Sequence, residues 1–320
     1  MKEHLLSLDT LNINLGSGEM VIVNFILAFV MFGVALSIRV STFKSILKKP
    51  KSVVIGLMLQ WFGLPALTCL LTIVLNPIIT PMVALGMILV ASCPGGNVSN
   101  FLSSLSKGNV ELSVSMTAIT TLFASIITPF NFWFWGTHYC KFAAIKNSIP
   151  TLDIPFSEML SQIILILGFP IVLGLLCSHY FPRLSKKIIK PSQILSIICF
   201  VAMVVVSMTQ VLSGFEQRWE VYAAILSALV IVVIHNVTAL GTGYYGGKMT
   251  QLPTKDCRTL AIEIGIQNSG LALALLFNPA IFAPEQWKSN GGMVIVAALW
   301  GIWHIISGLV ISKIFRRSKA

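Results

Sequence analysis

The sequence predicts an all-α polytopic membrane protein with about nine transmembrane helices. Of its 320 residues 56% are hydrophobic and only 10% are charged, and the mean hydropathy is +0.87. These values lie well outside the range of a soluble globular domain. A helix needs about 20 apolar residues to cross the roughly 30 Å of hydrocarbon in a bilayer. Nine stretches meet this requirement: 20–39, 53–76, 81–105, 110–135, 156–181, 194–212, 221–246, 257–281 and 293–315.

The nine stretches are continuously apolar, whereas the strands of a membrane barrel alternate apolar and polar residues, so we expect helices. Residues 1–19 contain three acidic side chains and no long apolar run. We therefore expect an extracytoplasmic N-terminal segment that is neither a signal peptide nor a transit peptide, followed by a transmembrane domain over 20–320. The six cysteines are scattered singly, which argues against a disulfide framework or a zinc site.

The basic residues predict the orientation of the chain. If the N-terminus lies outside, 17 of the 22 lysines and arginines fall in inside loops or the C-terminal tail, as the positive-inside rule requires. A basic cytoplasmic rim also accounts for the net charge of +11 without a nucleic-acid partner. We expect a multi-pass protein of the cell membrane, with the C-terminus in the cytoplasm. The absence of targeting signals suggests a bacterial inner membrane.

The stretch 81–105 carries Pro94, Gly95 and Gly96 side by side near its middle. Proline removes a backbone donor and glycine adds backbone freedom, so we expect the helix to break there. Unpaired backbone groups are costly in hydrocarbon, which means that such a break has to line a protein cavity or hold a ligand. A proline kink in a packed helix is the alternative interpretation.

The stretch 257–281 carries Glu263, followed closely by Gln267, Asn268 and Ser269. An acid at the centre of a membrane helix costs at least about 2.5 kcal/mol on insertion scales. One explanation is a neutral, protonated carboxyl group that is hydrogen-bonded to another helix. The other is a bound cation, which the lack of a lysine or arginine at matching depth favours. We therefore expect a second interrupted helix at this point.

Further oxygen-bearing side chains occur in the second, third and fourth stretches, and Ser113 and Thr117 share one helix face because they are four residues apart. Taken singly, each is more often an interhelical hydrogen bond than a ligand. Paired interrupted helices at corresponding places in two halves of a chain indicate inverted repeats, with a binding site where they cross. The oxygen-bearing side chains that are candidates for such a binding site are those of Gln60, Ser99, Asn100, Ser113 and Thr117.

Four motifs resemble those of the bile acid:sodium symporter (BASS/SBF) family. They are CPGGNVSN at 93–100, SKGNVELSVSMT at 106–117, EIGIQNSG at 263–270 and WHIISG at 303–308. They occur in the family's order and at its separations, and the resemblance extends from about residue 25 to 315. An asparagine that often follows the histidine in the last motif is replaced by Ile305 here. We therefore expect that any substrate contact made by that amide in the family is lost here.

The resemblance implies a core domain, built from 53–135 and 221–315, in which two broken helices cross and bind two sodium ions. It also implies a panel domain, built from 20–39 and 156–212, and a substrate cleft between the two domains. The implied ligands of the first sodium ion are Ser99, Asn100, Ser113, Thr117 and Glu263. Those of the second are Gln60, Glu263, Gln267 and the backbone carbonyls of Ile264 and Ile266. Asn97, Asn268 and His304 are implied to contact the substrate.

The expected function is sodium-coupled secondary active symport of an organic anion by alternating access, and not enzymatic catalysis. Bile-acid-like amphiphiles, pantoate-like acids and keto acids all suit the family. The expected partners are that anion, the lipid bilayer and Na⁺, with two sodium ions as coupling ions and no other cofactor, and the sequence is compatible with a monomer. An ion channel is the first alternative, because broken helices with carbonyl ligands also build filters. An intramembrane hydrolase is a weaker alternative, since His235 and His304 stand alone in the sequence.

Overall fold

The computed structural model describes residues 1–11, 17–36, 50–96, 98–147, 154, 156–213, 218–278, 281–282 and 289–318, and all of its regular elements in this part of the chain are helices. Two segments, η1 and η2, are π-helical and continue the α-helices on either side of them. The elements are α1 (Lys2–Asp9), α2 (Ser17–Leu36), α4 (Pro50–Met58), η1 (Leu59–Gly63), α5 (Leu64–Leu75), α6 (Pro81–Ser92), α7 (Val98–Leu105), α8 (Val110–Leu122), α9 (Ala124–Asn147), α10 (Phe156–Ile163), η2 (Ile164–Gly168), α11 (Phe169–Tyr180), α12 (Pro182–Ser213), α13 (Arg218–Met249), α14 (Thr254–Gly265), α15 (Ser269–Leu276) and α16 (Gly291–Arg317).

As far as its residues are described, every predicted apolar stretch coincides with a helix or with consecutive helices; 37–39, 97 and 279–280 lie outside the described residues. Within the part of the chain that the structure describes, five continuous helical stretches are long and apolar enough to cross a membrane, namely Pro50–Leu75, Leu160–Tyr180, Pro182–Ser213, Trp219–Met249 and Gly291–Arg317. The bent pair Val110–Leu122 and Ala124–Ile145 makes a sixth if it is counted as one span. The remaining predicted stretches correspond to α2, to α6 with α7, and to α14 with α15. The prediction of an all-helical membrane protein is confirmed.

Both predicted interruptions are present. The first helix of one pair, α6, ends at Ser92, and Cys93 is already extended with a ψ of 157°. In the other pair, α14 ends at Gly265 and α15 begins at Ser269. The two interruptions cross each other in the middle of the molecule, where Gly95 and Gln267 form an antiparallel β-bridge.

The crossing satisfies backbone groups that the two breaks release. The N–H of Gly96 donates to the carbonyl of Ile266 at 2.7 Å, and the N–H of Asn268 donates to the carbonyl of Pro94 at 2.9 Å. Each break therefore supplies partners for the other. This exchange explains how two non-helical segments are tolerated where water is scarce.

The stretch predicted at 110–135 is not one straight helix. Its two parts, α8 and α9, meet at Phe123 with a bend of 75°. Pro129 lies inside α9, where it cannot donate to the carbonyl of Ser125 and its ring crowds that carbonyl, so the turn next to the bend is weakened. The carbonyl of Phe123 instead accepts bonds from the N–H groups of Ile126 and Ile127.

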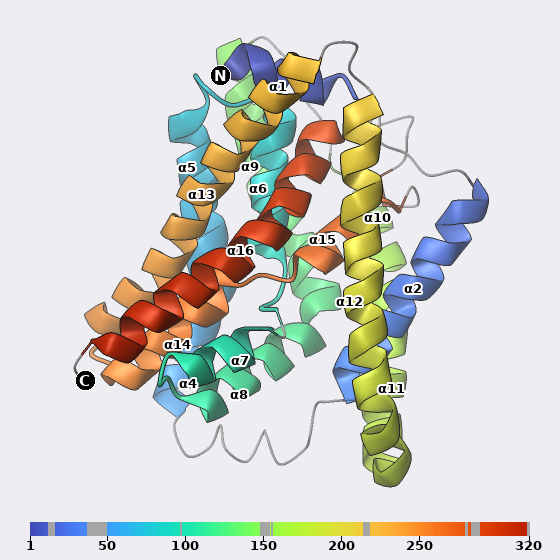
Figure 1. The fold of residues 1–320 in the computed structure, drawn as a ribbon, viewed down its shortest axis with the longest axis vertical. Helices are drawn as coiled ribbons and strands as arrows, with labels where there is room; N and C mark the ends of the chain where they lie inside the picture. The colour runs from blue at the N-terminus through green and yellow to red at the C-terminus, as the bar shows by residue number, and fades with distance from the viewer. Residues whose placement is uncertain are drawn as a thin grey trace.

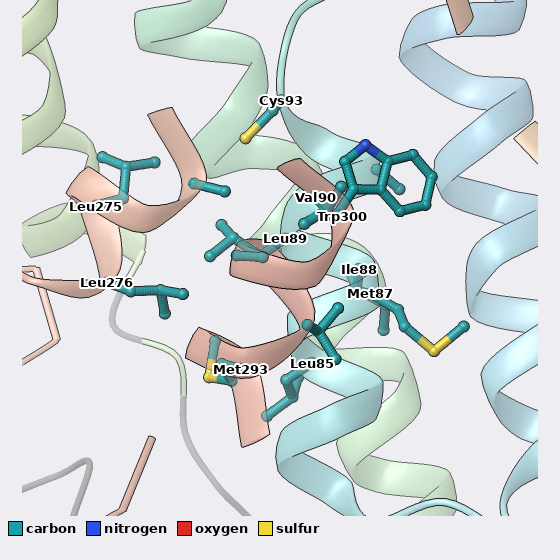
Figure 2. Close-up of a cluster of buried hydrophobic side chains, with 14 of the residues drawn as sticks. Leu85, Met87, Ile88, Leu89, Val90, Cys93, Leu275, Leu276, Met293 and Trp300 are labelled. Atoms are coloured by element: carbon teal, nitrogen blue, oxygen red, sulfur yellow. The ribbon is translucent and has the colours of Figure 1, made fainter. Parts of the chain in front are cut away.

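The core is built around α6, whose residues from Val83 to Ser92 are all buried. Figure 2 shows its side chains meeting Leu275 and Leu276 of α15 and Met293 and Trp300 of α16. A glycine allows α6 to approach α16, since a Cβ at Gly86 would lie 2.8 Å from the Cα of Met293. In Figure 1, α2, α11 and α12 stand together at one side of the molecule, and α2 packs against both of the others.

The N-terminal segment contains the short helix α1, which the sequence analysis did not predict. Its Leu5 and Leu8 are fully buried, and α1 contacts α6, α13 and α16. The Asp9 carboxylate accepts bonds from the Thr80 hydroxyl at 2.8 Å and from the Met82 N–H at 3.2 Å. Asp9 therefore caps the N-terminal end of α6, which holds α1 against the core.

Candidate cation site

The site is centred on Glu263, which lies in the last turn of α14 and is only 1% exposed. Three hydroxyl groups from two other helices donate to its carboxylate. The Ser99 hydroxyl of α7 lies 2.6 Å from Oε1, and the Thr117 hydroxyl of α8 lies 3.0 Å from Oε2. The Ser113 hydroxyl of α8 also bonds Oε1. Ser99 and Glu263 are 164 residues apart in sequence, and the fold brings them into direct contact.

Asn100 adds another oxygen to this cluster. Its Oδ1 accepts from the Ser113 hydroxyl at 2.9 Å and lies 3.4 Å from the Thr117 hydroxyl. We refer to Ser99, Asn100, Ser113 and Thr117, with the Glu263 carboxylate, as the hydroxyl site. Each hydroxyl has only one proton to donate. The Ser113 hydroxyl nevertheless lies within reach of two acceptors, Asn100 Oδ1 and the Glu263 carboxylate. The Thr117 hydroxyl lies within reach of the same two groups and of the Ser113 carbonyl on its own helix. Acceptor oxygens outnumber protons, which is the environment that a hard cation prefers.

A second cluster is formed by two amide side chains. Gln60, in the π-helical segment η1, donates from Nε2 to the Gln267 Oε1 at 2.8 Å and to the Cys93 carbonyl at 3.1 Å. Gln267 returns a bond from its Nε2 to the Gln60 Oε1 at 3.3 Å and donates to the Ile264 carbonyl at 2.6 Å. We refer to Gln60 and Gln267, with the carbonyls of Ile264 and Ile266, as the amide site.

The backbone carbonyls around the second break differ in how they are satisfied. Those of Ile264 and Ile266 each accept one bond, from Gln267 Nε2 and from the Gly96 N–H. A carbonyl has two lone pairs, so each keeps one free. Among the described residues no donor reaches the carbonyl of Glu263. Several carbonyl oxygens thus remain available beside the buried carboxylate.

Gly95 brings the first break directly against this carboxylate. A Cβ placed on Gly95 would lie 2.9 Å from Glu263 Oε2 and 3.4 Å from the Glu263 carbonyl. The first separation is shorter than a Cβ atom tolerates, and the second is at the lower limit of van der Waals contact. Any residue larger than glycine would therefore displace the Glu263 carboxylate. The Pro-Gly-Gly motif therefore serves both to interrupt the helix and to make room for the acid.

Of the residues expected to contact substrate, the structure places two near the crossing. Asn268 is partly exposed and caps α15, because its Oδ1 accepts from the Leu271 N–H at 3.0 Å. His304 is buried on α16, and no described residue bonds its Nδ1. One turn further along α16, Gly308 packs against Ile266 at the second break, so His304 lies close to the crossing. Asn97 lies outside the described residues.

Two buried polar residues that contact or belong to α14, the helix that carries Glu263, were not assigned a role from the sequence. The Asn236 amide of α13 donates to the Gly265 carbonyl at 2.8 Å. Asp256, at the start of α14, accepts from the Ser52 hydroxyl at 2.6 Å and from the Asn109 amide at 2.8 Å. An asparagine in the middle of an apolar stretch is a signal that could have identified Asn236. Asp256 lay in a predicted loop, where an acid is unremarkable.

Comparison with known proteins identifies the family. A model of the Sodium Bile acid symporter family matches residues 24–218. An uncharacterized sodium-dependent transporter of Bacillus subtilis is 29% identical over 286 residues, which is 89% of this chain and 80% of that protein. A probable sodium/metabolite cotransporter of Arabidopsis thaliana chloroplasts, BASS1, is 28% identical over 91% of this chain and 66% of its own length. The human ileal sodium/bile acid cotransporter is 27% identical over 83% of this chain and 71% of its own length.

The family match includes the first break and every hydroxyl of the site, and the relatives align over most of the chain. The resemblance read from the four motifs is thereby confirmed. Sodium-coupled symport is a membrane transport activity, not an enzymatic one. The chain belongs to the sodium bile acid symporter family, and it is a multi-pass, sodium-dependent membrane transporter.

Proposed function

We propose that this protein carries an organic anion into the cell together with two sodium ions. The observation that carries the proposal is the convergence of Ser99, Ser113 and Thr117 on the buried carboxylate of Glu263, with Asn100 alongside. An isolated buried carboxylate is costly unless it is neutralised. A sodium ion at the hydroxyl site would neutralise it once the hydroxyl protons rotate outward and present their oxygens.

The second sodium ion would occupy the amide site. Gln60 and Gln267 each carry an amide oxygen, and the carbonyls of Ile264 and Ile266 each keep a free lone pair. In the described structure the two amides bond each other, so they have to turn for a cation to be held between their oxygens. Glu263 lies beside both sites and balances the charge of the first ion to enter.

The proposed substrate position lies where the two second half-helices begin. Both α7 and α15 start directly after the crossing, so their positive dipole ends would favour a carboxylate or sulfate group placed there. Asn97, Asn268 and His304 are proposed to contact the rest of the anion. The candidates are bile-acid-like amphiphiles, pantoate-like acids and keto acids. The name of the Bacillus relative mentions sodium dependence and no substrate, so it favours none of these three classes of anion.

Alternating access would follow from movement between two groups of helices. We assign α2, α10, α11 and α12 to the panel and the crossing helices with α4, α5, α8, α9, α13 and α16 to the core. The N-terminus and the C-terminus lie at opposite ends of the molecule (Figure 1), which suits an N-terminus outside and a basic C-terminal end in the cytoplasm. We propose a bacterial inner membrane as the location.

Ion and substrate binding should be coupled, because sodium orders the segments that hold the anion. Such coupling is reciprocal and typically amounts to about 1–3 kcal/mol. Two sodium ions that enter with a monovalent anion also move one positive charge. A tenfold sodium gradient and a potential of 100 mV would then supply roughly 5 kcal/mol, enough for accumulation on the order of thousands-fold.

The test begins with a thermal-shift screen of the purified protein against organic anions, with sodium chloride or with choline chloride. An anion that stabilises the protein only in sodium is then used for uptake into proteoliposomes, with membrane current recorded. We expect sodium-driven uptake accompanied by inward positive current. Electroneutral uptake would contradict the stoichiometry, and uptake that proceeds equally without sodium would contradict the coupling. Unitary currents in the absence of any anion would favour the channel alternative.

A further inference from the structure

The end of α14 poses a backbone problem that a second residue solves. A helix that ends inside a protein leaves its last carbonyls without N–H partners from the next turn. The Ile262 carbonyl is satisfied by the Ile266 N–H at 2.9 Å. The carbonyl of Gly265, the last residue of α14, lies where the chain leaves the helix. Its partner is a side chain, the Asn236 amide, at 2.8 Å.

The orientation of the Asn236 amide is determined by this bond. Asn236 is 0% exposed, and its Oδ1 has no partner among the described residues. Turning the amide over would place its oxygen against the Gly265 carbonyl, which is unfavourable because both groups are acceptors. The side chain therefore presents its N–H to the end of α14.

The helix that carries Asn236 is a close support for α14. A Cβ at Gly243 would lie 2.1 Å from the Leu260 carbonyl, and one at Gly247 would lie 3.1 Å from Cys257 Sγ. These contacts pair 247 with 257 and 243 with 260, so the two helices run antiparallel, and Asn236 comes level with Gly265 at the break. The glycine contacts fix one end of α14 and Asn236 fixes the other.

We infer that Asn236 is a positioning residue for the sodium sites. It does not touch the ions; it acts through the Gly265 carbonyl on the turn that carries Glu263, Ile264 and Gln267. Without its N–H, the Gly265 carbonyl is left buried and unpaired, and the turn has to rotate to find another donor. That rotation moves the carboxylate away from the oxygens of α7 and α8, and it displaces the Ile264 carbonyl from the amide site. The inference rests on the sodium-binding role proposed above.

The experiment compares sodium binding by the purified full-length protein and by Asn236→Leu, which keeps a similar volume but has no donor. The unfolding temperature is followed against sodium chloride concentration, with choline chloride holding the ionic strength constant. We expect the sodium concentration for half-maximal stabilisation to rise about tenfold in the variant, a factor that corresponds to about 1.4 kcal/mol. A residue that only packs would lower the unfolding temperature at every sodium concentration and leave this midpoint unchanged.

The matched control is Thr242→Val on the same helix. Thr242 is also buried, but its hydroxyl donates to the Thr238 carbonyl of its own helix, so its midpoint should stay that of the parent protein. If Asn236→Leu does not fold, Asn236→Ser is measured instead, with a smaller rise because a water molecule has room to bridge.

The outcomes separate this inference from the proposed function. An unchanged midpoint in a folded Asn236 variant, while the parent protein responds to sodium, would overturn the positioning role alone. An equal rise in Thr242→Val would also overturn it, because any loss of a buried hydrogen bond on α13 would then suffice. A parent protein that sodium does not stabilise would overturn both proposals.

Discussion

The hydroxyl site contains the Glu263 carboxylate and the amide site contains the carbonyl of the next residue, Ile264, yet the hydrogen bonds of the two sites are arranged in opposite ways. At the hydroxyl site, several acceptors compete for few protons around a carboxylate. At the amide site, Gln60 and Gln267 satisfy each other and two backbone carbonyls. The first arrangement invites a cation, whereas the second is closed until its own bonds are broken.

This difference predicts an order of binding. Sodium should enter the hydroxyl site first, because only proton rotations are needed there. Filling the amide site requires the exchange of about two hydrogen bonds, each with a net value of about 0.5–1.5 kcal/mol. The second ion should therefore bind roughly tenfold to a hundredfold more weakly, unless the first ion has already reorganised the crossing.

The largest effect is expected from Glu263→Gln, because it removes the charge that we propose both sodium ions share. The amide that replaces the carboxylate also removes one acceptor oxygen and adds two protons, which use up the surplus of acceptors in the cluster. We expect the sodium response to weaken by at least about a hundredfold, since hydrogen bonds and contacts to a buried charge are worth about 3–5 kcal/mol. Sodium-dependent thermal stabilisation measures the loss. A sodium midpoint close to that of the parent protein would exclude Glu263 as the common anion.

Thr117→Val tests the hydroxyl site with little change in shape. It removes one oxygen from the cluster and should raise the sodium midpoint about tenfold, as expected for a lost bond to a charged group of about 1.5 kcal/mol. The control is Thr120→Val on the same helix, whose hydroxyl donates to the Thr117 carbonyl and not to Glu263. Equal shifts of the sodium midpoint in the two variants would show that the hydroxyl site has no special role in sodium binding. The proposed difference between the hydroxyl site and the amide site would then be wrong.

Gln60→Leu tests the amide site. If the second ion binds there, the first binding step should change little, with a midpoint shift of about threefold or less, corresponding to about 0.6 kcal/mol. The steepness of the sodium dependence should fall instead, from a Hill coefficient approaching 2 towards 1. Sodium-dependent uptake of the anion found in the screen measures both quantities. A large midpoint shift with unchanged steepness would reverse the proposed order of the two sites.

The sequence was sufficient to predict the two breaks because their cause is local. Pro94 and the two glycines cannot sustain a helix, and an acid followed by amides cannot lie in lipid. The spacing of Ser113 and Thr117 likewise predicted a shared face. That the hydroxyl of Ser99 would reach the same carboxylate oxygen as that of Ser113 depends on how two helix pairs cross. The family resemblance, not the spacing, supplied that expectation.

Other features were not predictable because tertiary contacts create them. The bond from Asn236 to Gly265 joins two helices whose register only the fold reveals. The docking of α1 is similar, because a short amphipathic segment in a polar N-terminus is stabilised by packing and not by its own propensity.

The last residue of α1, Asp9, offers a second carboxylate with which that of Glu263 can be compared. Asp9 accepts a threonine hydroxyl and a backbone N–H, as an isolated capping residue would. Burial raises its pKa from 3.8 to about 7, and the bonds from Thr80 and Met82 only partly oppose that rise. Because the folded protein holds this proton more tightly than the unfolded chain, its stability should fall as the pH rises from about 4 to about 7. Above that range the contribution of Asp9 should be constant.

Asp9→Asn should have the smallest effect on sodium and a visible effect on pH dependence. The asparagine cannot ionise, so between pH 5 and pH 8 the unfolding temperature of the parent protein should decline relative to that of the variant. The sodium midpoint should be the same in both, because two donors on one carboxylate leave no cluster of surplus oxygens for a cation. A sodium midpoint that shifts as far as in Thr117→Val would mean that any hydroxyl-bonded buried acid in this protein senses sodium. The hydroxyl site would then be distinguished by its position at the crossing and not by its excess of acceptors.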